Sequence, residues 1–486
     1  MPENRSTTSR YEPRDLRLGV VRGISYGLFG PPGAFVPQAR ALGAGLVRAY
    51  VYWGQVEPEP GHYTFEAVDA LLAQLDGDEE VWITLCSSSP WATRTATDFL
   101  PPSPARDIAA YAEFVRRVVR RCAGRVRFWQ CDNEPSNTGL LWAGTAEEYV
   151  AQLTAMHAAA KQADPDCAVV LGGCGYDVLS GGEGSEPWRF FEHVVAAGRD
   201  AYDLFDVHLY GDAALIPAHL AAARRLMASG GPVRPIVAGE YAAPIPFEFP
   251  EVGAVLYQEL AAAFADAPQT QSTAELAERE TRETPERRAM NALYERMAEL
   301  PPRLQMFMEG CPPELSARRD RINGRQLVMA NMQALAEGVR RTVYWNLAPE
   351  VSAPVDHRQI MHLMFGKLAL MAYQGDDLAI HRPAAGAFAL LAERLAGATR
   401  VTRVAVGDRP SLRAFEADRG GRGPLLVLWD ERDPFDGEDE PPVTVTLPWT
   451  APAVTAVDAL GGRPAAELRD GLLRLPVTDT PVFLTA

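Results

Sequence analysis

The sequence predicts an α/β chain that folds as a (β/α)8 barrel, a TIM barrel, followed by a C-terminal antiparallel β-sandwich. Eight short apolar runs alternate with stretches of helical period between residues 16 and 347, which indicates a parallel sheet covered by helices on its outer side. Near residue 400 the pattern changes to short alternating runs punctuated by Gly, Asp and Pro, which is typical of antiparallel strands. A doubly wound sheet is the alternative for the first part, and it ranks lower because no glycine-rich nucleotide fingerprint follows an early strand.

The expected strands are rich in Val, Ile and aromatic residues, and they lie at 16–27, 45–53, 80–87, 125–133, 167–175, 203–210, 234–241 and 341–347. The expected helices carry apolar residues at helical spacing, and they lie at 67–75, 107–122, 145–162, 188–198, 213–229, 326–341 and 384–397. These units spread over about 380 residues, more than the ~250 of a typical barrel, so insertions are expected.

The chain divides into three expected parts after a polar, disordered tail at residues 1–14. Residues 15–397 form the barrel, and within them residues 244–325 form a helical insertion after the seventh strand. This insertion leaves from the face where barrel active sites lie, so it is either a peripheral excursion or a wall over the pocket. Residues 398–486 form the sandwich, whose acidic stretch at 431–442 is interpreted as a solvated turn rather than a Ca²⁺ site.

Composition narrows the function classes. The formal net charge of −16 argues against a nucleic-acid binder, which normally shows a basic stripe. No window approaches a membrane span and the N-terminus has no apolar signal region, so a cytoplasmic protein is expected. The six cysteines show no CxxC spacing and are expected to be buried, reduced thiols, and no metal or cofactor is expected. The oligomeric state is left open.

Candidate functional residues follow from the barrel geometry, because chemistry in this fold lies where strands end at the C-terminal face. The polar and aromatic side chains at these strand ends are Arg48, Trp91, Asn133, Glu134, His208, Tyr210, Glu240 and Trp345. Two carboxylates facing one cavity are what glycoside hydrolysis requires, one protonated and one ionised. Asp132, Asp177 and Asp206 also lie near strand ends and are not counted among the substrate-binding residues.

Each candidate has a functional and a structural interpretation. Arg48 would hold Glu240 ionised, and Tyr210 would donate a hydrogen bond to the same carboxylate. Asn133 is placed to bond a sugar hydroxyl, while Trp91 and Trp345 offer faces for stacking on a sugar ring or simply pack at the barrel rim. Glu134 alone could be an acid that favours a helix N-terminus, since Pro135 suits a first turn. His208 could be an ordinary core histidine.

Three segments resemble clan A glycoside hydrolases. Asn133-Glu134-Pro135 after an apolar strand resembles the acid/base signature of the clan, and Glu240 in IVAGEY resembles its nucleophile. The segment VRAYVYWGQVEPEPGHYTFEAVDALL at 47–72 resembles its second strand and following helix. The resemblance covers most of residues 16–397, and the trailing β module is similar to that of the β-xylosidase and α-L-iduronidase family. The long insertion departs from the clan pattern.

The resemblance implies a retaining, double-displacement glycosidase without a cofactor. Glu134 would be the acid/base and Glu240 the nucleophile, while Arg48, Asn133, His208 and Tyr210 would line the sugar site. We expect a small carbohydrate substrate with a β-linkage and exo action on short glycosides. A non-catalytic carbohydrate-binding protein on the same scaffold and a transglycosylase are the alternatives.

Overall fold

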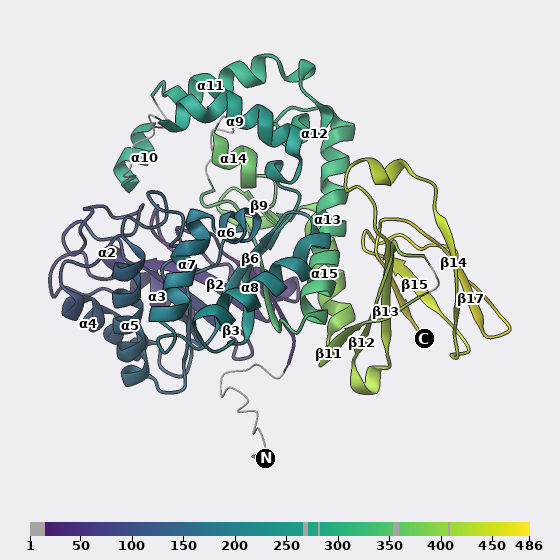
Figure 1. Ribbon diagram of the computed structural model, residues 1–486, viewed down its shortest axis with the longest axis horizontal. Coiled ribbons are helices and arrows are strands. Elements are labelled where there is room, and N and C mark those ends of the chain that lie inside the picture. The colour runs from purple at the N-terminus through teal and green to yellow at the C-terminus, as the bar shows by residue number, and fades with distance from the viewer. Residues whose placement is uncertain (1–14, 266–270, 280–281, 353–358, 407–408) are drawn as a thin grey trace.

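The computed structural model describes residues 15–265, 271–279, 282–352, 359–406 and 409–486, so the predicted tail at 1–14 lies outside the described residues. All eight predicted barrel strands are present. They are β1 (Arg17–Val21), β2 (Leu46–Tyr52), β3 (Glu80–Cys86), β4 (Phe128–Cys131), β5 (Ala168–Val170), β6 (Phe205–Tyr210), β7 (Ile236–Ala242) and β8 (Arg341–Tyr344). The prediction of a parallel barrel is therefore confirmed (Figure 1).

The sheet runs in the order β5-β4-β3-β2-β1-β8-β7-β6, and all its pairs are parallel. Two parallel bridges join β5 and the segment after it to β6, Val170 with Leu204 and Cys174 with Val207. The hydrogen bond from His208 N to Cys174 O, at 2.9 Å, belongs to this closure. The barrel is thus closed, and the carboxyl ends of its strands share one mouth.

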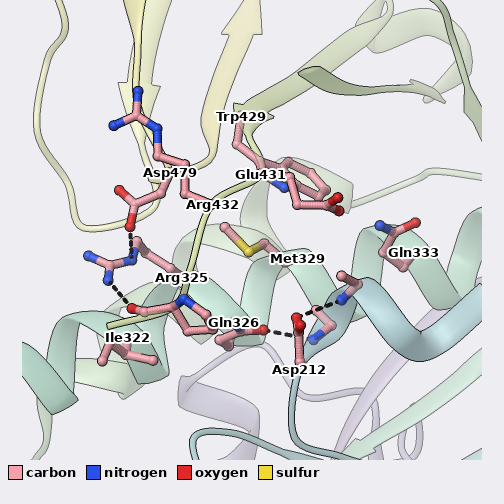
Figure 2. A pocket seen from close by; sticks show the side chains of 13 residues that line it. Asp212, Ile322, Arg325, Gln326, Met329, Gln333, Trp429, Glu431, Arg432 and Asp479 are labelled. Atoms are coloured by element: carbon pink, nitrogen blue, oxygen red, sulfur yellow. Dashed lines mark hydrogen bonds and ion pairs between the residues drawn. The ribbon is translucent and has the colours of Figure 1, made fainter. Parts of the chain in front are cut away.

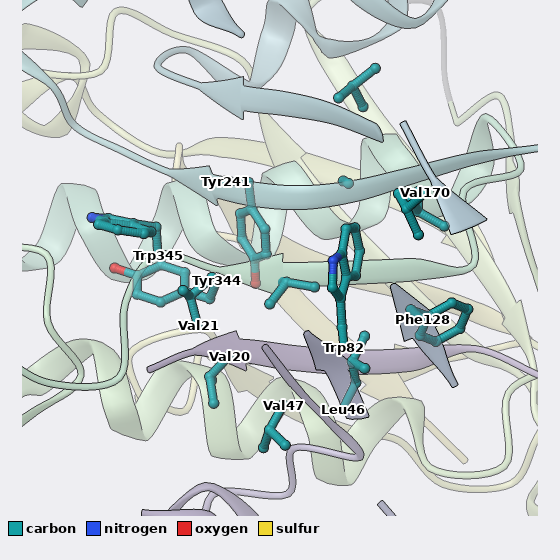
Figure 3. Close-up of a cluster of buried hydrophobic side chains, with 14 of the residues drawn as sticks. Val20, Val21, Leu46, Val47, Trp82, Phe128, Val170, Tyr241, Tyr344 and Trp345 are labelled. Carbon is teal, nitrogen blue, oxygen red and sulfur yellow. The ribbon is translucent and has the colours of Figure 1, made fainter. Parts of the chain in front are cut away.

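Helices surround the barrel in the order of the chain. They are α1 (Val36–Ala41), α2 (Trp53–Val56), α3 (Glu66–Leu72), α4 (Ile108–Arg121), α5 (Ala146–Ala163), α6 (Tyr176–Gly181), α7 (Glu186–Ala197) and α8 (Ile216–Gly230). Their starts are encoded locally: Thr145 and Glu148 form a capping box at α5, and the Asp107 side chain accepts from Ala109 N at α4. The buried faces of these helices and the apolar strands form one continuous core, part of which Figure 3 shows around Trp82 and Tyr344.

The stretch between β7 and β8 holds α9 (Pro250–Ala265), α10 (Thr273–Arg279), α11 (Pro285–Glu295), α12 (Pro302–Gln305) and the long helix α13 (Pro313–Ala336). Helix α13 crosses residue 325 without a break, so it belongs to both the predicted insertion and the predicted barrel helix at 326–341. A hydrophobic cluster separate from the barrel core is built mainly from the insertion, with Phe249, Leu256 and Ile322 among its members. In Figure 1, α9, α10, α11 and α12 lie on one side of the barrel, above α6 and α7, while α13 runs down beside the barrel toward α15.

The insertion also contacts the loop after β3. Leu100 and Gln271 exchange two backbone hydrogen bonds of 3.0 and 2.7 Å, and Thr273 donates from its N and its hydroxyl to Asp98. In the closed sheet β3 and β7 lie four strands apart in both directions. A segment that leaves at β7 and is fastened at the β3 loop therefore joins opposite sides of the mouth.

The chain after β8 contains elements that the sequence did not predict, namely α14 (Ile360–Phe365) and the antiparallel hairpin of β9 (Met371–Gln374) and β10 (Asp377–His381). Helix α15 (Pro383–Leu395) follows as predicted and packs on α13.

The C-terminal module is the predicted antiparallel sandwich. One sheet has the order β11-β12-β13-β18-β15 and the other β14-β17-β16. The strands are β11 (Arg400–Arg403), β12 (Leu412–Asp418), β13 (Leu425–Asp430), β14 (Val443–Pro448), β15 (Thr455–Asp458), β16 (Glu467–Arg469), β17 (Leu472–Val477) and β18 (Val482–Thr485). A shared cluster with Leu428, Val445 and Leu475 fills the space between the sheets. The exact domain boundaries stay predictions.

The acidic stretch at 431–442 exposes most of its acidic side chains, as expected of a solvated turn, but two of its residues make contacts that the sequence did not predict. Glu438 forms ion pairs with Arg318, Arg321 and Arg325 of α13. Phe435 is buried in the hydrophobic cluster of the insertion. The sequence did not predict these ion pairs, because the arginine partners lie far earlier in the chain and approach the stretch only in the folded protein. The acidic residues therefore fasten the sandwich to the barrel.

Arg325 is central to this junction. Its guanidinium also pairs with Asp479 of the sandwich, at 3.1 Å (Figure 2).

All six cysteines carry free thiols, and five of them are buried, as predicted. Among the helices described, none has the length and apolar character needed to cross a lipid bilayer.

Candidate active site

The ends of β4, β6 and β7 bring two glutamates and a histidine together at the mouth. One ligand atom each of Glu134, His208 and Glu240 lies within 4.8 Å of the others. His208 Nδ1 lies 2.5 Å from Glu134 Oε1 and 3.5 Å from Glu240 Oε2. Glu134 has a φ of 41° and Asp132 a φ of 50°, a left-handed conformation that costs residues with a side chain about 1–3 kcal/mol. Such strained backbone concentrates at functional sites.

The Glu240 carboxylate is enclosed by donors. Arg48 Nη1 donates to Oε1 at 2.9 Å and the Tyr50 hydroxyl donates to the same oxygen at 2.6 Å. The Tyr210 hydroxyl donates to Oε2 at 2.6 Å. The Glu240 side chain is 5% exposed. Burial by itself raises the pKa of Glu240, but His208, Arg48 and the two tyrosines outweigh burial and hold the pKa below its ordinary value. Glu240 is therefore ionised at neutral pH.

Arg48 is fully buried and fixed by a fork of acceptors. Besides Glu240 it donates to Gly239 O, Gln130 Oε1, Asn133 Oδ1 and Thr84 Oγ1, over 2.7–3.1 Å. A planar guanidinium suits this arrangement because its five N–H groups point in fixed directions. The Asn133 oxygen is thus occupied, and its amide nitrogen has no partner among the described residues. That nitrogen is the atom available to a ligand hydroxyl.

His208 lies between three carboxylates. Its Nε2 is 3.2 Å from Asp206 Oδ2, while its Nδ1 faces the two glutamates. Burial by itself lowers the pKa of His208, but Glu240, Asp206 and Glu134 raise the pKa to about 10. The imidazole is therefore protonated at neutral pH. This disfavours a metal ion on the three ligand atoms, because a metal-bound imidazole must give up that proton.

The Glu134 carboxyl differs from Glu240. Its side chain is 17% exposed, and His208 holds Oε1, while no described residue bonds to Oε2. Burial raises the pKa of Glu134, His208 opposes that effect, and the charges of Glu240 and Asp177 add to it, so that the pKa lies above its ordinary value. Two neighbouring carboxyls thus have pKa values pushed in opposite directions, the arrangement expected for an acid and a nucleophile.

Two glycines make room for this cluster. A Cβ on Gly173 would lie 2.2 Å from His208 Nε2, and one on Gly239 would lie 2.5 Å from either oxygen of Asp206. Gly239 N also donates to Asp206 Oδ1 at 2.5 Å. Both positions therefore need glycine because the side chains of the site approach the backbone closely.

The aromatic candidates separate into two groups. Trp345 contacts Phe365, which contacts Tyr210 beside the carboxylate pair. Within the part of the chain that the structure describes, the Trp345 Nε1 and Asn346 Oδ1 atoms are buried and have no hydrogen-bond partner, and the peptide bond between these two residues is cis.

Trp91 behaves differently. It donates its indole N–H to Glu57 O at 2.9 Å and packs on Trp53. No contact within the described part of the chain connects it to the carboxylate pair. The predicted role of Trp91 as a substrate platform stays a prediction.

The sequence reasoning missed several members of the cluster, namely Tyr50, Thr84, Gln130, Asp206 and Gly173. A signal was available. Successive side chains of a strand point to opposite faces, so polar residues two positions apart share the inner face of a barrel. Arg48 and Tyr50 have this spacing, as do Asp206, His208 and Tyr210.

No protein-family model matches the chain, and no curated protein sequence matches it. Solved structures do match. A family 39 glycoside hydrolase from the gut symbiont Bacteroides cellulosilyticus WH2 aligns with a TM-score of 0.62 and 14% identity, over 98% of this chain and 82% of its own. A glucosidase from Croceicoccus marinus has a TM-score of 0.56 and 14% identity, over 97% and 95%. A monomeric β-xylosidase from Caulobacter crescentus CB15 has a TM-score of 0.54 and 14% identity, over 97% and 96%.

At this level of identity the likeness establishes the fold. The alignments extend over both the barrel and the C-terminal sandwich, so the layout implied by the sequence resemblance is confirmed.

Proposed function

We propose that the chain is a retaining glycoside hydrolase that acts on a β-linked sugar, with Glu134 as acid/base and Glu240 as nucleophile. The observation that carries this proposal is the pair itself, because carboxylate oxygens of the two glutamates lie within 4.8 Å at the barrel mouth. Retaining enzymes hold their carboxyl groups about 5–5.5 Å apart, whereas inverting enzymes leave about 6.5–9.5 Å for a water molecule. The likeness of the fold to the three solved hydrolases also supports the proposal of a glycoside hydrolase.

In the first step the protonated Glu134 gives its proton to the glycosidic oxygen while an oxygen of Glu240 attacks the anomeric carbon. The bond to the leaving group breaks, and an ester between the sugar and Glu240 forms. In the second step the Glu134 carboxylate takes a proton from water, the water oxygen attacks the anomeric carbon, and the ester bond breaks. Both carboxyls return to their starting forms, and two inversions leave the anomeric configuration retained.

The surrounding residues would hold the sugar and tune the pair. Arg48 and Tyr210 fix the nucleophile by direct hydrogen bonds. The free amide nitrogen of Asn133 would donate to a sugar hydroxyl. The unpartnered Trp345 Nε1 and Asn346 Oδ1 would supply a further donor and acceptor, since buried polar atoms normally have partners.

Exo action on short glycosides is part of the proposal. The connection between the insertion and the β3 loop, made by Gln271 and Thr273, joins opposite sides of the mouth. A long polymer needs an open groove on both sides of the scissile bond, whereas a short glycoside needs a pocket with one entrance. Colorimetric release from aryl glycosides should therefore exceed internal cleavage of polysaccharides by orders of magnitude, and random mid-chain cleavage in a product series would contradict exo action.

The test of the activity is a panel of aryl β-glycosides, with Glu134→Gln and Glu240→Ala as variants. Wild-type protein should turn over at least one member. Glu240→Ala should lose turnover, and added azide should restore part of it as a glycosyl azide of inverted configuration. Saturable sugar binding without turnover across the panel would instead support a carbohydrate-binding protein.

A further inference from the structure

A third carboxylate, Asp177, lies beside Glu134 and has no part in the two steps described above. It belongs to α6, the short helix that follows β5. Ser136 donates from its hydroxyl to Asp177 Oδ2 at 3.2 Å, and Ser136 is two residues beyond Glu134. This bond fastens the loop after β5 to the loop that carries the acid/base carboxyl.

Gly175, directly before α6, lies close to both the Asp177 and the Glu134 carboxyl groups. A Cβ on Gly175 would lie 2.6 Å from Asp177 Oδ1 and 3.0 Å from Glu134 Oε1. Both oxygens therefore approach the same point beside the bare backbone of Gly175, and the two carboxyls are close to one another. At such a separation like charges repel appreciably, because the site is partly shielded from water.

The charged and titratable groups that face Glu134 come from every element packed against it. They are His208 and Tyr210 of β6, Glu240 of β7, Asp177 of α6 and Cys174 of the loop after β5. Among them, Glu240 and Asp177 disfavour the charged form of Glu134, and His208 favours that form. Burial raises the pKa of Asp177 above its ordinary value, although the donors at Val178 and Ser136 and the charge of His208 oppose that effect.

The two repelling carboxylates differ during the reaction. When Glu240 becomes an ester it loses its charge, so its effect on Glu134 disappears for the second step. Asp177 forms no covalent bond in either step, so the ester does not alter its carboxyl group. The balance between His208 and Asp177 therefore determines how readily Glu134 gives up a proton in the first step and recovers it in the second.

We propose that Asp177 is a positioning residue for the acid/base carboxyl: its charge, held 3.2 Å from the Ser136 hydroxyl, keeps Glu134 protonated for attack on glycosides with basic leaving groups. The proposal rests on the proposed glycosidase function. By this proposal, a residue outside the catalytic pair controls the alkaline limb of the activity against pH. The same residue controls which leaving groups the enzyme can release.

The kinetic test is the Asp177→Asn variant, which removes the charge and preserves the shape. We expect the alkaline limb of kcat/KM against pH to move to lower pH, with a loss of roughly three- to tenfold on that limb. The acidic limb, which reports Glu240, should stay in place. Aryl glycosides with poor leaving groups should lose more than those with good leaving groups, because only the former need the proton from Glu134.

The matched control is Asp200→Asn, which makes the same charge change on an exposed side chain after α7, at the opposite end of the barrel. It should leave both limbs unchanged. Asp177→Ala serves as a second variant if Asn at this position impairs folding. Unchanged limbs and unchanged leaving-group dependence in a folded Asp177 variant would overturn the proposal.

A direct titration separates this inference from the activity itself. In protein labelled with ¹³C at the glutamate carboxyl carbons, the Glu134 signal is identified by its loss in Glu134→Gln. Its midpoint should be lower in Asp177→Asn than in wild type, without any substrate present. An unchanged midpoint overturns the role of Asp177. If no aryl glycoside is turned over, the proposed function fails while a lowered midpoint still supports the charge coupling.

Discussion

Replacing Arg48 by methionine should uncouple the nucleophile from the cation that keeps it charged. Methionine has a similar length and no charge, so it fills most of the space while removing the guanidinium. The pair is buried, with the two side chains 0% and 5% exposed, and its N···O distance is 2.9 Å. The same substitution removes donors from Gln130 and Asn133.

The size of the effect follows from this geometry. At an effective dielectric constant of about 20, opposite charges whose centres are about 4 Å apart attract by about 4 kcal/mol. Breaking a buried pair on one side costs about 3–5 kcal/mol because the remaining charge loses its partner. We therefore expect the free energy of unfolding of Arg48→Met at pH 7 to fall by about 3–5 kcal/mol. The pKa of Glu240 should rise, and kcat/KM at neutral pH should fall by roughly 100-fold or more.

The assay is urea denaturation at several pH values, combined with the pH profile of kcat/KM. In wild type the folded-state pKa of Glu240 is lowered, so its stabilisation is present above its unfolded pKa and is lost as the pH falls through the folded pKa. The stability difference between wild type and Arg48→Met should therefore shrink toward acidic pH. The acidic limb of the activity profile should move to higher pH in the variant.

Arg341→Met is the matched control. Arg341 is also almost fully buried and pairs with Glu80 and Asp15, but it lies at the start of β8, at the end of the barrel away from the mouth. It should destabilise the protein and leave the acidic limb where it is. If both variants shift the limb equally, or if the stability difference for Arg48→Met does not depend on pH, the electrostatic reasoning is wrong.

Four further outcomes are expected. Tyr50→Phe removes the 2.6 Å hydrogen bond to the proposed nucleophile and should lower kcat roughly 10- to 100-fold in steady-state assays, with little change in stability. Gly173→Ala places a Cβ 2.2 Å from a ring nitrogen of His208 and should cost about 1–3 kcal/mol by urea denaturation, whereas Gly386→Ala, which meets open space in α15, should not destabilise. Because the folded-state pKa of His208 is raised from 6.5 to about 10, its stabilisation is full below pH 6.5 and disappears toward pH 10; His208→Asn should flatten that part of the stability curve. Glu438→Gln removes the charge shared by three arginines of α13 and should lower the free energy of unfolding by about 1–3 kcal/mol, measured in the same way, and it should speed proteolysis between barrel and sandwich.

The barrel could be predicted from the sequence because its signals are local. Each strand is an apolar run, as in AVV of β5 or LVRAYVY of β2, and each is followed by helical periodicity. The hairpin of β9 and β10 was missed because its residues are mostly half-exposed or exposed and lack a clear apolar alternation. Contacts between residues far apart in the chain could not be predicted from local sequence patterns. The arginine partners of the 431–442 stretch were missed for this reason.

The site was predictable in part for the same reason. Glu134 and Glu240 stand out as charges directly after apolar strands. Tyr50 and Gln130 did not stand out, since an aromatic or an amide within a strand is compatible with ordinary packing. Their role depends on Arg48, which Tyr50 contacts from the same strand and Gln130 contacts from β4, two strands away in the sheet. Asp177 could not be assigned, because its distance from Glu134 is set by the fold of two loops.

The buried charges of the site also indicate why Glu134 carries a proton. Arg48 and His208 supply two positive charges, whereas Asp206, Glu240 and Asp177 supply three negative ones, so a charged Glu134 would add to an excess of negative charge that is shielded from water. The neutral acid avoids that cost. In the proposed reaction Glu240 loses its negative charge on forming the ester, and Glu134 gains one as it becomes a carboxylate. Proton donation in the first step and base action in the second therefore both leave the total charge of the cluster unchanged.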